Sequence, residues 1–159
     1  MREQGFTDGL IMQVRTMDIR DNACHRDIIN KGITKSNTED ININKGVIQA
    51  CENEGMLKAN RDGMGNILFN ERTIHTLINN RIMDSNQACG ISLENNSTIT
   101  TFANAGATNG GGIVGDSTIT NFTNKGTIHR KHNKALGINH SSAGTLSNSG
   151  FIKKMIALP

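Results

Sequence analysis

The chain contains no Trp, no Tyr and one Pro, and aromatic residues make up only 3% of its 159 residues. Any interior must therefore be built from aliphatic side chains, because aromatic rings supply little of the apolar surface. The three cysteines, Cys24, Cys51 and Cys89, lie at unrelated spacings without a Cys-x-x-Cys pair. This pattern supports neither a zinc site nor a redox motif, so we expect small buried hydrophobes or half-exposed thiols.

Long hydrophobic runs are also absent. No segment approaches the roughly 20 apolar residues of a membrane-spanning helix, so no transmembrane segment is predicted. The first ten residues lack the apolar stretch of a secretory signal peptide.

Acidic residues are scarce in the second half of the chain. Residues 1–94 contain 11 basic and 13 acidic residues, whereas residues 95–159 contain six basic residues and one acid, Asp116. Hydrolysis of a glycosidic bond generally needs two carboxylates, so the sequence predicts a protein that is not an enzyme. No cofactor or metal site is predicted, because the histidine pair His129 and His132 lies in a basic loop without nearby acids or cysteines.

The same loop holds the candidate contact residues for an anion or a glycan, which are Arg130, Lys131 and Lys134. Exposed cations attract anionic surfaces such as sulfated glycans or acidic lipid head groups, although such a run is more often a solvated face. The shortage of aromatic residues argues against specific nucleic-acid binding, which relies on rings that stack against bases.

Ile and Asn are abundant, with 20 and 21 copies. Ile favours strands and Asn is normally excluded from them, so the pairing indicates a chain that turns every few residues. A degenerate repeat explains it: Thr-Ile, then Leu or Phe, then Asn-x-Gly-x-Ile, with the best copy at residues 117–128. The apolar residue in mid-repeat recurs at spacings of 25, 20 and 24 residues, at Leu77, Phe102, Phe122 and Leu146. Such a period signals stacked repeats.

Each copy predicts one rung of an all-β solenoid of parallel strands, with rungs of about 20–25 residues. Polar and apolar residues alternate in Thr118–Ile119–Thr120, which predicts a strand with one buried face. A bend near Asn121 would let Ile119 and Phe122 both point inward. A turn at residues 124–126 then leads into another short strand. Glycines in this turn, Gly106, Gly126 and Gly150, are expected to hold positive φ.

Equivalent residues of successive rungs should form columns. One column is expected from Ile74, Ile99 and Ile119, a second from the mid-repeat residues, and a third from Ile82, Ile128 and Ile152. Stacked amides should form a ladder of hydrogen bonds through Asn79, Asn104, Asn124 and Asn148.

The solenoid is expected over residues 28–152, with a cap or irregular segment at 1–27 and a tail at 153–159. Leu10, Val14 and Met17 have helical spacing, which favours a short capping helix within residues 7–19. Gly32, Gly46 and Gly55 are only 14 and 9 residues apart, so the early region is either a distorted solenoid or a set of half-rungs. Open solenoid edges favour end-to-end self-association.

The repeat Gly-Ile…Thr-Ile-x-x-Phe-x-Asn-x-Gly-x-Ile resembles those of type V autotransporter passengers from Gram-negative bacteria, especially vacuolating-cytotoxin-like passengers. The resemblance covers roughly residues 28–152 and implies a right-handed parallel β-helix. It also implies a non-catalytic adhesin or stalk that contacts a glycan or protein on a host or neighbouring cell. The alternative is a carbohydrate-active β-helix enzyme, either a polysaccharide lyase or a hydrolase.

This chain departs from the passenger pattern because it shows no signal peptide or translocator barrel and has three cysteines. The expected explanation is a fragment or a truncated reading frame. Its location would then be the cell surface or the medium as part of a longer autotransporter, whereas the chain alone is consistent with a cytoplasmic location.

Overall fold

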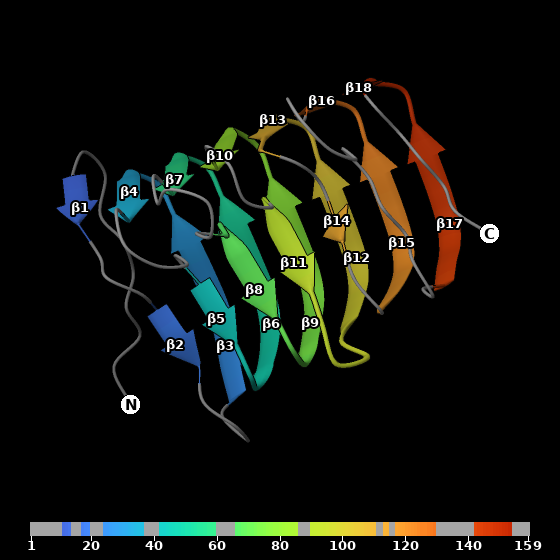
Figure 1. The fold of residues 1–159 in the computed structure, drawn as a ribbon, viewed down its shortest axis with the longest axis horizontal. Helices are drawn as coiled ribbons and strands as arrows, with labels where there is room; N and C mark the ends of the chain where they lie inside the picture. The colour runs from blue at the N-terminus through green and yellow to red at the C-terminus, as the bar shows by residue number, and fades with distance from the viewer. Residues whose placement is uncertain are drawn as a thin grey trace.

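The structure, a computed structural model, describes residues 11–13, 17–19, 24–36, 42–59, 66–85, 90–110, 113–114, 117–129 and 142–153. All elements in these ranges are β-strands, and every strand pair is parallel. The strands stack into the coils of a β-solenoid, as the repeat predicts (Figure 1). Its handedness stays a prediction.

Each regular coil begins with a strand of seven residues, and these strands form one six-stranded sheet, the long-strand sheet. Its strands are β3 (Cys24–Asn30), β6 (Val47–Asn53), β9 (Thr73–Asn79), β12 (Thr98–Asn104), β15 (Thr118–Asn124) and β17 (Ser142–Asn148).

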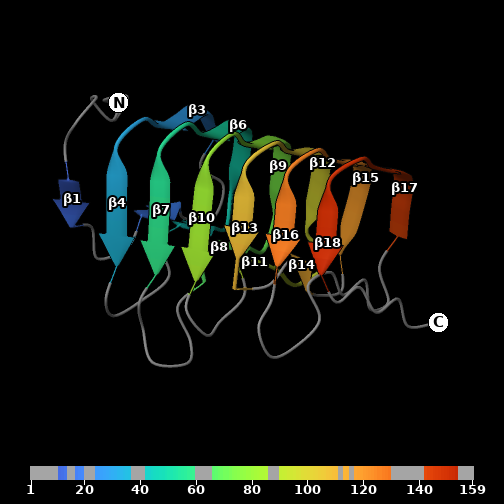
Figure 2. The same ribbon diagram turned by 90° about the horizontal axis from the view of Figure 1, so that it is seen from above.

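After a tight turn, which we call the first corner, the chain enters a seven-stranded sheet (Figure 2). It contains β1 (Ile11–Gln13), β4 (Ile33–Ser36), β7 (Met56–Ala59), β10 (Ile82–Ser85), β13 (Ala107–Asn109), β16 (Thr127–His129) and β18 (Phe151–Lys153).

A five-stranded sheet completes the coil, and the second corner leads from it to the next long strand. It contains β2 (Met17–Ile19), β5 (Asn42–Asn44), β8 (Leu68–Asn70), β11 (Ile91–Leu93) and β14 (Ile113–Val114).

The long strands bury two residues three positions apart, as the expected bend requires. In β15, Ile119 and Phe122 are buried while the two residues between them, Thr120 and Asn121, are both exposed. A regular strand alternates at every residue, so two consecutive outward residues mark a local break in the alternation. The strand pairing skips Thr120 and resumes in the same register at Asn121.

Two of the three predicted columns are confirmed in register. Ile74, Ile99 and Ile119 pair across β9, β12 and β15, and all three are buried. Leu77, Phe102 and Phe122 are buried in the second column, with the two phenylalanine rings 5.3 Å apart between centroids. Leu146 occupies the same slot but is 45% exposed, because its strand β17 is the last in the sheet.

The third predicted column is wrong at Ile82. Ile82 pairs with Ala107, and Ala107 pairs with Thr127, so Ile82 lies one position before the slot of Ile128. Met83 occupies the inward slot instead and is 1% exposed, whereas Ile82 is half-buried. Because side chains alternate between the faces of a strand, a shift of one residue exchanges inward and outward positions.

The predicted positive φ at Gly106, Gly126 and Gly150 is also wrong, because among the described glycines only Gly110 has a φ in that range, at 98°. At these glycines the neighbouring coil instead leaves no room for a Cβ, whereas Arg81 occupies the equivalent slot one coil before Gly106. A Cβ on Gly126 would overlap the carbonyl oxygen of Gly106, and one on Gly150 would overlap that of Gly126. Close backbone stacking therefore favours glycine here.

The predicted N-terminal helix is wrong, since Ile11–Gln13 and Met17–Ile19 are strands. β1 pairs with β4 and β2 pairs with β5, so both sheets begin before residue 28. An open sheet edge offers a full row of backbone hydrogen bonds, and these outweigh the weak helical spacing of three apolar residues.

Regular stacking also explains the short early glycine spacings. Gly32 and Gly55 stand at the first corner of successive coils, whereas Gly46 stands at the second corner between β5 and β6. The spacings of 14 and 9 residues are therefore two parts of one coil, in agreement with the half-rung alternative.

Candidate functional site

A ladder of asparagine amides runs along the first corner. The side-chain amide nitrogen (Nδ2) of each Asn donates to the amide oxygen (Oδ1) of the Asn one coil further on, over 2.7–2.9 Å. The ladder consists of Asn30, Asn53, Asn79, Asn104, Asn124 and Asn148. It includes the four asparagines that the sequence points to and two earlier ones.

All members of the ladder except Asn148 are buried. Burial of an amide is costly unless its hydrogen bonds are made. Asn53 also donates to the carbonyl of Ile82, and Asn104 accepts from the buried hydroxyl of Thr108. The amides therefore act as internal connectors between coils and are not available to a ligand.

A shorter ladder lies at the second corner, where Asn44 Nδ2 donates to Asn70 Oδ1 over 2.7 Å. It ends at the next coil, because Leu93 pairs with Asn70 in the sheet. The backbone changes at the same place. Two residues connect Asn70 to Thr73, but four connect Leu93 to its counterpart, Thr98.

The two extra residues form a left-handed turn. Asn95 and Asn96 have φ values of 56° and 57°, and the backbone N–H of Ser97 donates to the carbonyl of Glu94 over 3.1 Å. Asn is one of the few residues that adopt this conformation at low cost. Non-glycine residues in the left-handed region cluster at functional sites.

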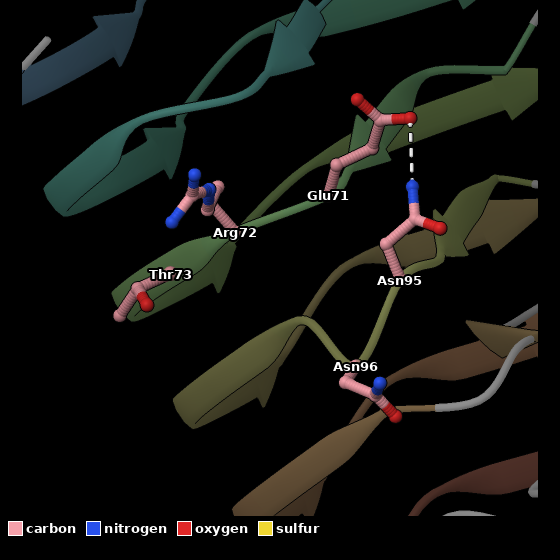
Figure 3. A pocket seen from close by; sticks show the side chains of 5 residues that line it. All are labelled: Glu71, Arg72, Thr73, Asn95 and Asn96. Carbon is pink, nitrogen blue, oxygen red and sulfur yellow. Dashed lines mark hydrogen bonds between the residues drawn. The ribbon is translucent and has the colours of Figure 1, made fainter. Parts of the chain in front are cut away.

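The turn borders an open hollow of about 420 Å³ lined by Glu71, Arg72, Thr73, Asn95 and Asn96 (Figure 3). On one side Asn95 Nδ2 donates to Glu71 Oε1 over 3.0 Å, and Arg72 and Thr73 lie on the other. Glu71 also forms an ion pair of 3.6 Å with Lys45 of the preceding coil. Amide, hydroxyl, carboxylate and guanidinium groups together can hydrogen-bond a polar ligand such as a sugar.

Sequence reasoning missed this hollow. The signal that could have found it is the distance from the end of one apolar run to the next Thr-Ile pair, which lengthens by two residues before Thr98. Because the repeat is degenerate, such a change in length is hard to see without the register.

The described charged side chains differ between the early and the late coils of the solenoid. Cross-coil ion pairs join Lys31 to Glu54, Lys45 to Glu71 and Lys58 to Asp84, and all six side chains belong to coils before β11. In the described residues after 95, Lys125 and Lys153 are exposed and no carboxylate side chain occurs. His129 lies beside Lys153 in register. The predicted contact residues Arg130, Lys131 and Lys134 lie outside the described residues.

Cys51 fills a core slot between Ile28 and Leu77 and is buried, whereas Cys24 is exposed. Burial raises the pKa of the Cys51 thiol to about 12, because a thiolate would be poorly solvated in the apolar core. Cys51 therefore behaves as the small hydrophobe that the sequence indicates; Cys89 lies outside the described residues.

No protein-family model, no curated protein and no solved structure matches this chain. Within the described ranges, no helix is long and apolar enough to cross a membrane. The same ranges contain no group of three or more His, Cys, Asp or Glu side chains that could hold a metal ion.

Proposed function

We propose that the chain is a non-catalytic β-solenoid module of a bacterial autotransporter-type surface protein. It contributes adhesion to a host or neighbouring cell, through a surface glycan or protein, or serves as a stalk. The observation that carries the proposal is the continuous amide ladder, which fixes the spacing of six successive long strands. A regularly spaced solenoid presents long rows of equivalent side chains, as extended binding surfaces do.

The use of the carboxylates supports a non-catalytic role. Glu54, Glu71 and Asp84 each contact a lysine of a neighbouring coil, and Glu52 accepts a hydrogen bond from Asn80 over 2.9 Å. These acids link coils to one another. A glycosidase would instead direct a pair of carboxylates at one bond of its substrate.

Binding to cells tests the proposal. Fluorescently labelled chain is titrated onto cultured epithelial cells and onto a glycan array, with unlabelled chain as competitor. We expect saturable binding that the competitor displaces. Heat-unfolded protein is the control. Absence of saturable binding to both surfaces would contradict adhesion and leave the stalk role.

The second candidate function is a carbohydrate-active enzyme, and a pair of glutamates at the second corner favours it. Glu71 and Glu94 follow Asn70 and Leu93, which pair in adjacent coils, so two carboxylates stand at the same corner. Adjacent strands lie about 4.8 Å apart, so the backbone positions of the two glutamates are close enough for their carboxyl groups to reach the separation of about 5–5.5 Å found in retaining glycosidases.

Incubation with a panel of polysaccharides separates the two functions. The adhesion proposal expects no release of reducing ends and no unsaturated products. Turnover that Glu71→Gln abolishes, while Glu54→Gln leaves it intact, would assign the hollow to catalysis.

A further inference from the structure

The outward face of the long-strand sheet is unusually rich in threonine. The outward residues of β12 and β15 include six threonines beside Asn121 and Ala103, and these are Thr98, Thr100, Thr101, Thr118, Thr120 and Thr123. They form rows across the strands because equivalent positions pair in register. One row contains Thr73, Thr98 and Thr118, and another contains Thr76, Thr101, Asn121 and Thr145. We call the outward side of β9, β12, β15 and β17 the threonine face.

The threonine face lacks the charges found elsewhere on the molecule. Among its described outward side chains only His75 is titratable. The neighbouring seven-stranded sheet, by contrast, carries Lys58 and Asp84 on its outward side, joined as an ion pair. Soluble proteins normally carry charges on all exposed faces, so a face without them marks a surface with a particular use.

The rows are also rigid. Strand pairing sets the distance between successive threonines at about 4.8 Å, and β-branched side chains have few rotamers. The hydroxyls are therefore arranged before a ligand arrives, so little side-chain entropy is lost on binding. Each hydroxyl offers one donor and two acceptor sites, so one that already makes a bond inside the protein can still bond a ligand.

The chemistry of the face limits its partner. It has no Lys or Arg for an anionic polymer, and it has no Trp, Tyr or Arg of the kind that anchors most protein interfaces. Rows of hydroxyls fit a partner that repeats and carries hydroxyls of its own.

We propose that the threonine face binds an uncharged, repeating polysaccharide laid along the axis of the solenoid. This inference rests on the proposed adhesion function and names its ligand class and surface. A chain in this direction meets equivalent threonines on each coil. Because each contact is a single weak hydrogen bond, affinity must come from many contacts and must grow with the length of the polymer.

Depletion from solution tests the proposal. The chain is mixed with particles of cellulose, chitin, cross-linked dextran and insoluble starch in 1 M NaCl, where the screening length is about 3 Å. We expect binding to at least one polymer, with affinity at least tenfold above that for its disaccharide. Binding that occurs at low salt but disappears in 1 M NaCl would show that charged residues hold the polymer, and this would overturn the proposal.

A triple variant, Thr100→Val, Thr101→Val and Thr120→Val, locates the surface. Valine keeps the β-branched shape and removes the hydroxyl, so circular dichroism and the melting temperature should stay close to wild type. We expect at least tenfold weaker binding, whereas Thr127→Val on the seven-stranded sheet should bind like wild type. Equal binding by the triple variant would overturn the proposal.

Failure of wild type on every uncharged polymer would also overturn the inference. If the chain still binds cells or the glycan array, the proposed adhesion function survives without this surface. Inhibition of ice recrystallisation by wild type but not by the triple variant would assign the face to an ice lattice and thus also overturn the proposal.

Discussion

At the scale of single residues, asparagine side chains connect neighbouring coils, as disulfides or aromatic clusters connect elements in other folds of this size. Asn104 receives a hydrogen bond from Asn79 and gives one to Asn124, so it connects three coils through one buried side chain. Its Nδ2 also faces the carbonyl oxygens of Gly106 and Thr127, at 3.3 and 3.4 Å. Such a fully bonded amide rigidifies the core, but a half-bonded one would weaken it.

Removal of one ladder amide should therefore be costly. We expect Asn104→Ala to lower the free energy of unfolding by about 1–3 kcal/mol, because it deprives the buried amides of Asn79 and Asn124 of a partner. The exposed Asn121→Ala is the matched control and should change it by less than about 0.5 kcal/mol. Urea unfolding followed by circular dichroism measures both. Equal losses would show that the ladder adds no stability.

In the second core column, substitution by alanine should lower the free energy of unfolding by different amounts at two residues in the same slot. Phe122 is 2% exposed and packs on Phe102, whereas Leu146 is 45% exposed. Phe122→Ala should cost about 3–5 kcal/mol, the usual range for a buried phenylalanine. Leu146→Ala should cost less than about 1.5 kcal/mol, because much of the side chain is already in water. A loss below about 1 kcal/mol for Phe122→Ala would contradict its place in the core.

At the scale of elements, the first corner is defined by close contact between backbones. The N–H groups of Lys125 and Gly126 both donate to the carbonyl of Asn104, which holds the two turns together. The same slot in an earlier coil holds Arg81, and there the carbonyl of Asn53 accepts from Asn80. The turns at Gly106, Gly126 and Gly150 are each fastened by two such bonds from consecutive residues, whereas the N–H of Gly55 donates to Asn53 Oδ1 instead.

A side chain at Gly126 should disrupt this contact. Gly126→Val places a Cβ against the carbonyl of Gly106, so we expect a loss of about 1–3 kcal/mol or more from overpacking. Thr127→Val, on the neighbouring half-buried outward position, should stay within about 0.5 kcal/mol of wild type. Thermal melts of the two variants provide the comparison. Similar melting temperatures would rule out a steric requirement for glycine.

At the scale of the whole molecule, charge is distributed unevenly along the solenoid. In the early coils Lys31, Lys45 and Lys58 are neutralised by cross-coil pairs, but Lys125 and Lys153 in the late coils have no carboxylate among the described residues after 95. Exposed pairs of this kind contribute about 0–1 kcal/mol each, so they matter more for the surface potential than for stability. The late coils should attract anions.

Heparin chromatography tests this attraction. We expect retention at low salt and elution as the ionic strength approaches 0.15 M, where the screening length is about 8 Å. Replacement of Arg130, Lys131 and Lys134 by Ser should bring elution to lower salt. No retention at low salt would end the anion hypothesis, and unchanged elution of the variant would exclude these three residues.

The sequence by itself determined the repeating unit and most of what it buries. Residues equivalent to Ile99, Phe102 and Asn104 recur at fixed positions of the repeat. Because the coils stack in parallel, each of these residues lies beside the equivalent residue of the next coil. The sequence was less informative at turns, where it carries no measure of how closely two backbones approach. It therefore indicated glycine at the corner but gave the wrong physical reason.

Only the tertiary structure decided the features that depend on register between coils. It placed Met83 in the core in place of Ile82, because a strand reverses its faces with a shift of one residue. It also turned the N-terminal segment into edge strands, and it revealed that Asn95 and Asn96 are an insertion beside Glu71. Register couples residues about 20–26 positions apart, and a local pattern holds no information on that alignment until the coils are stacked.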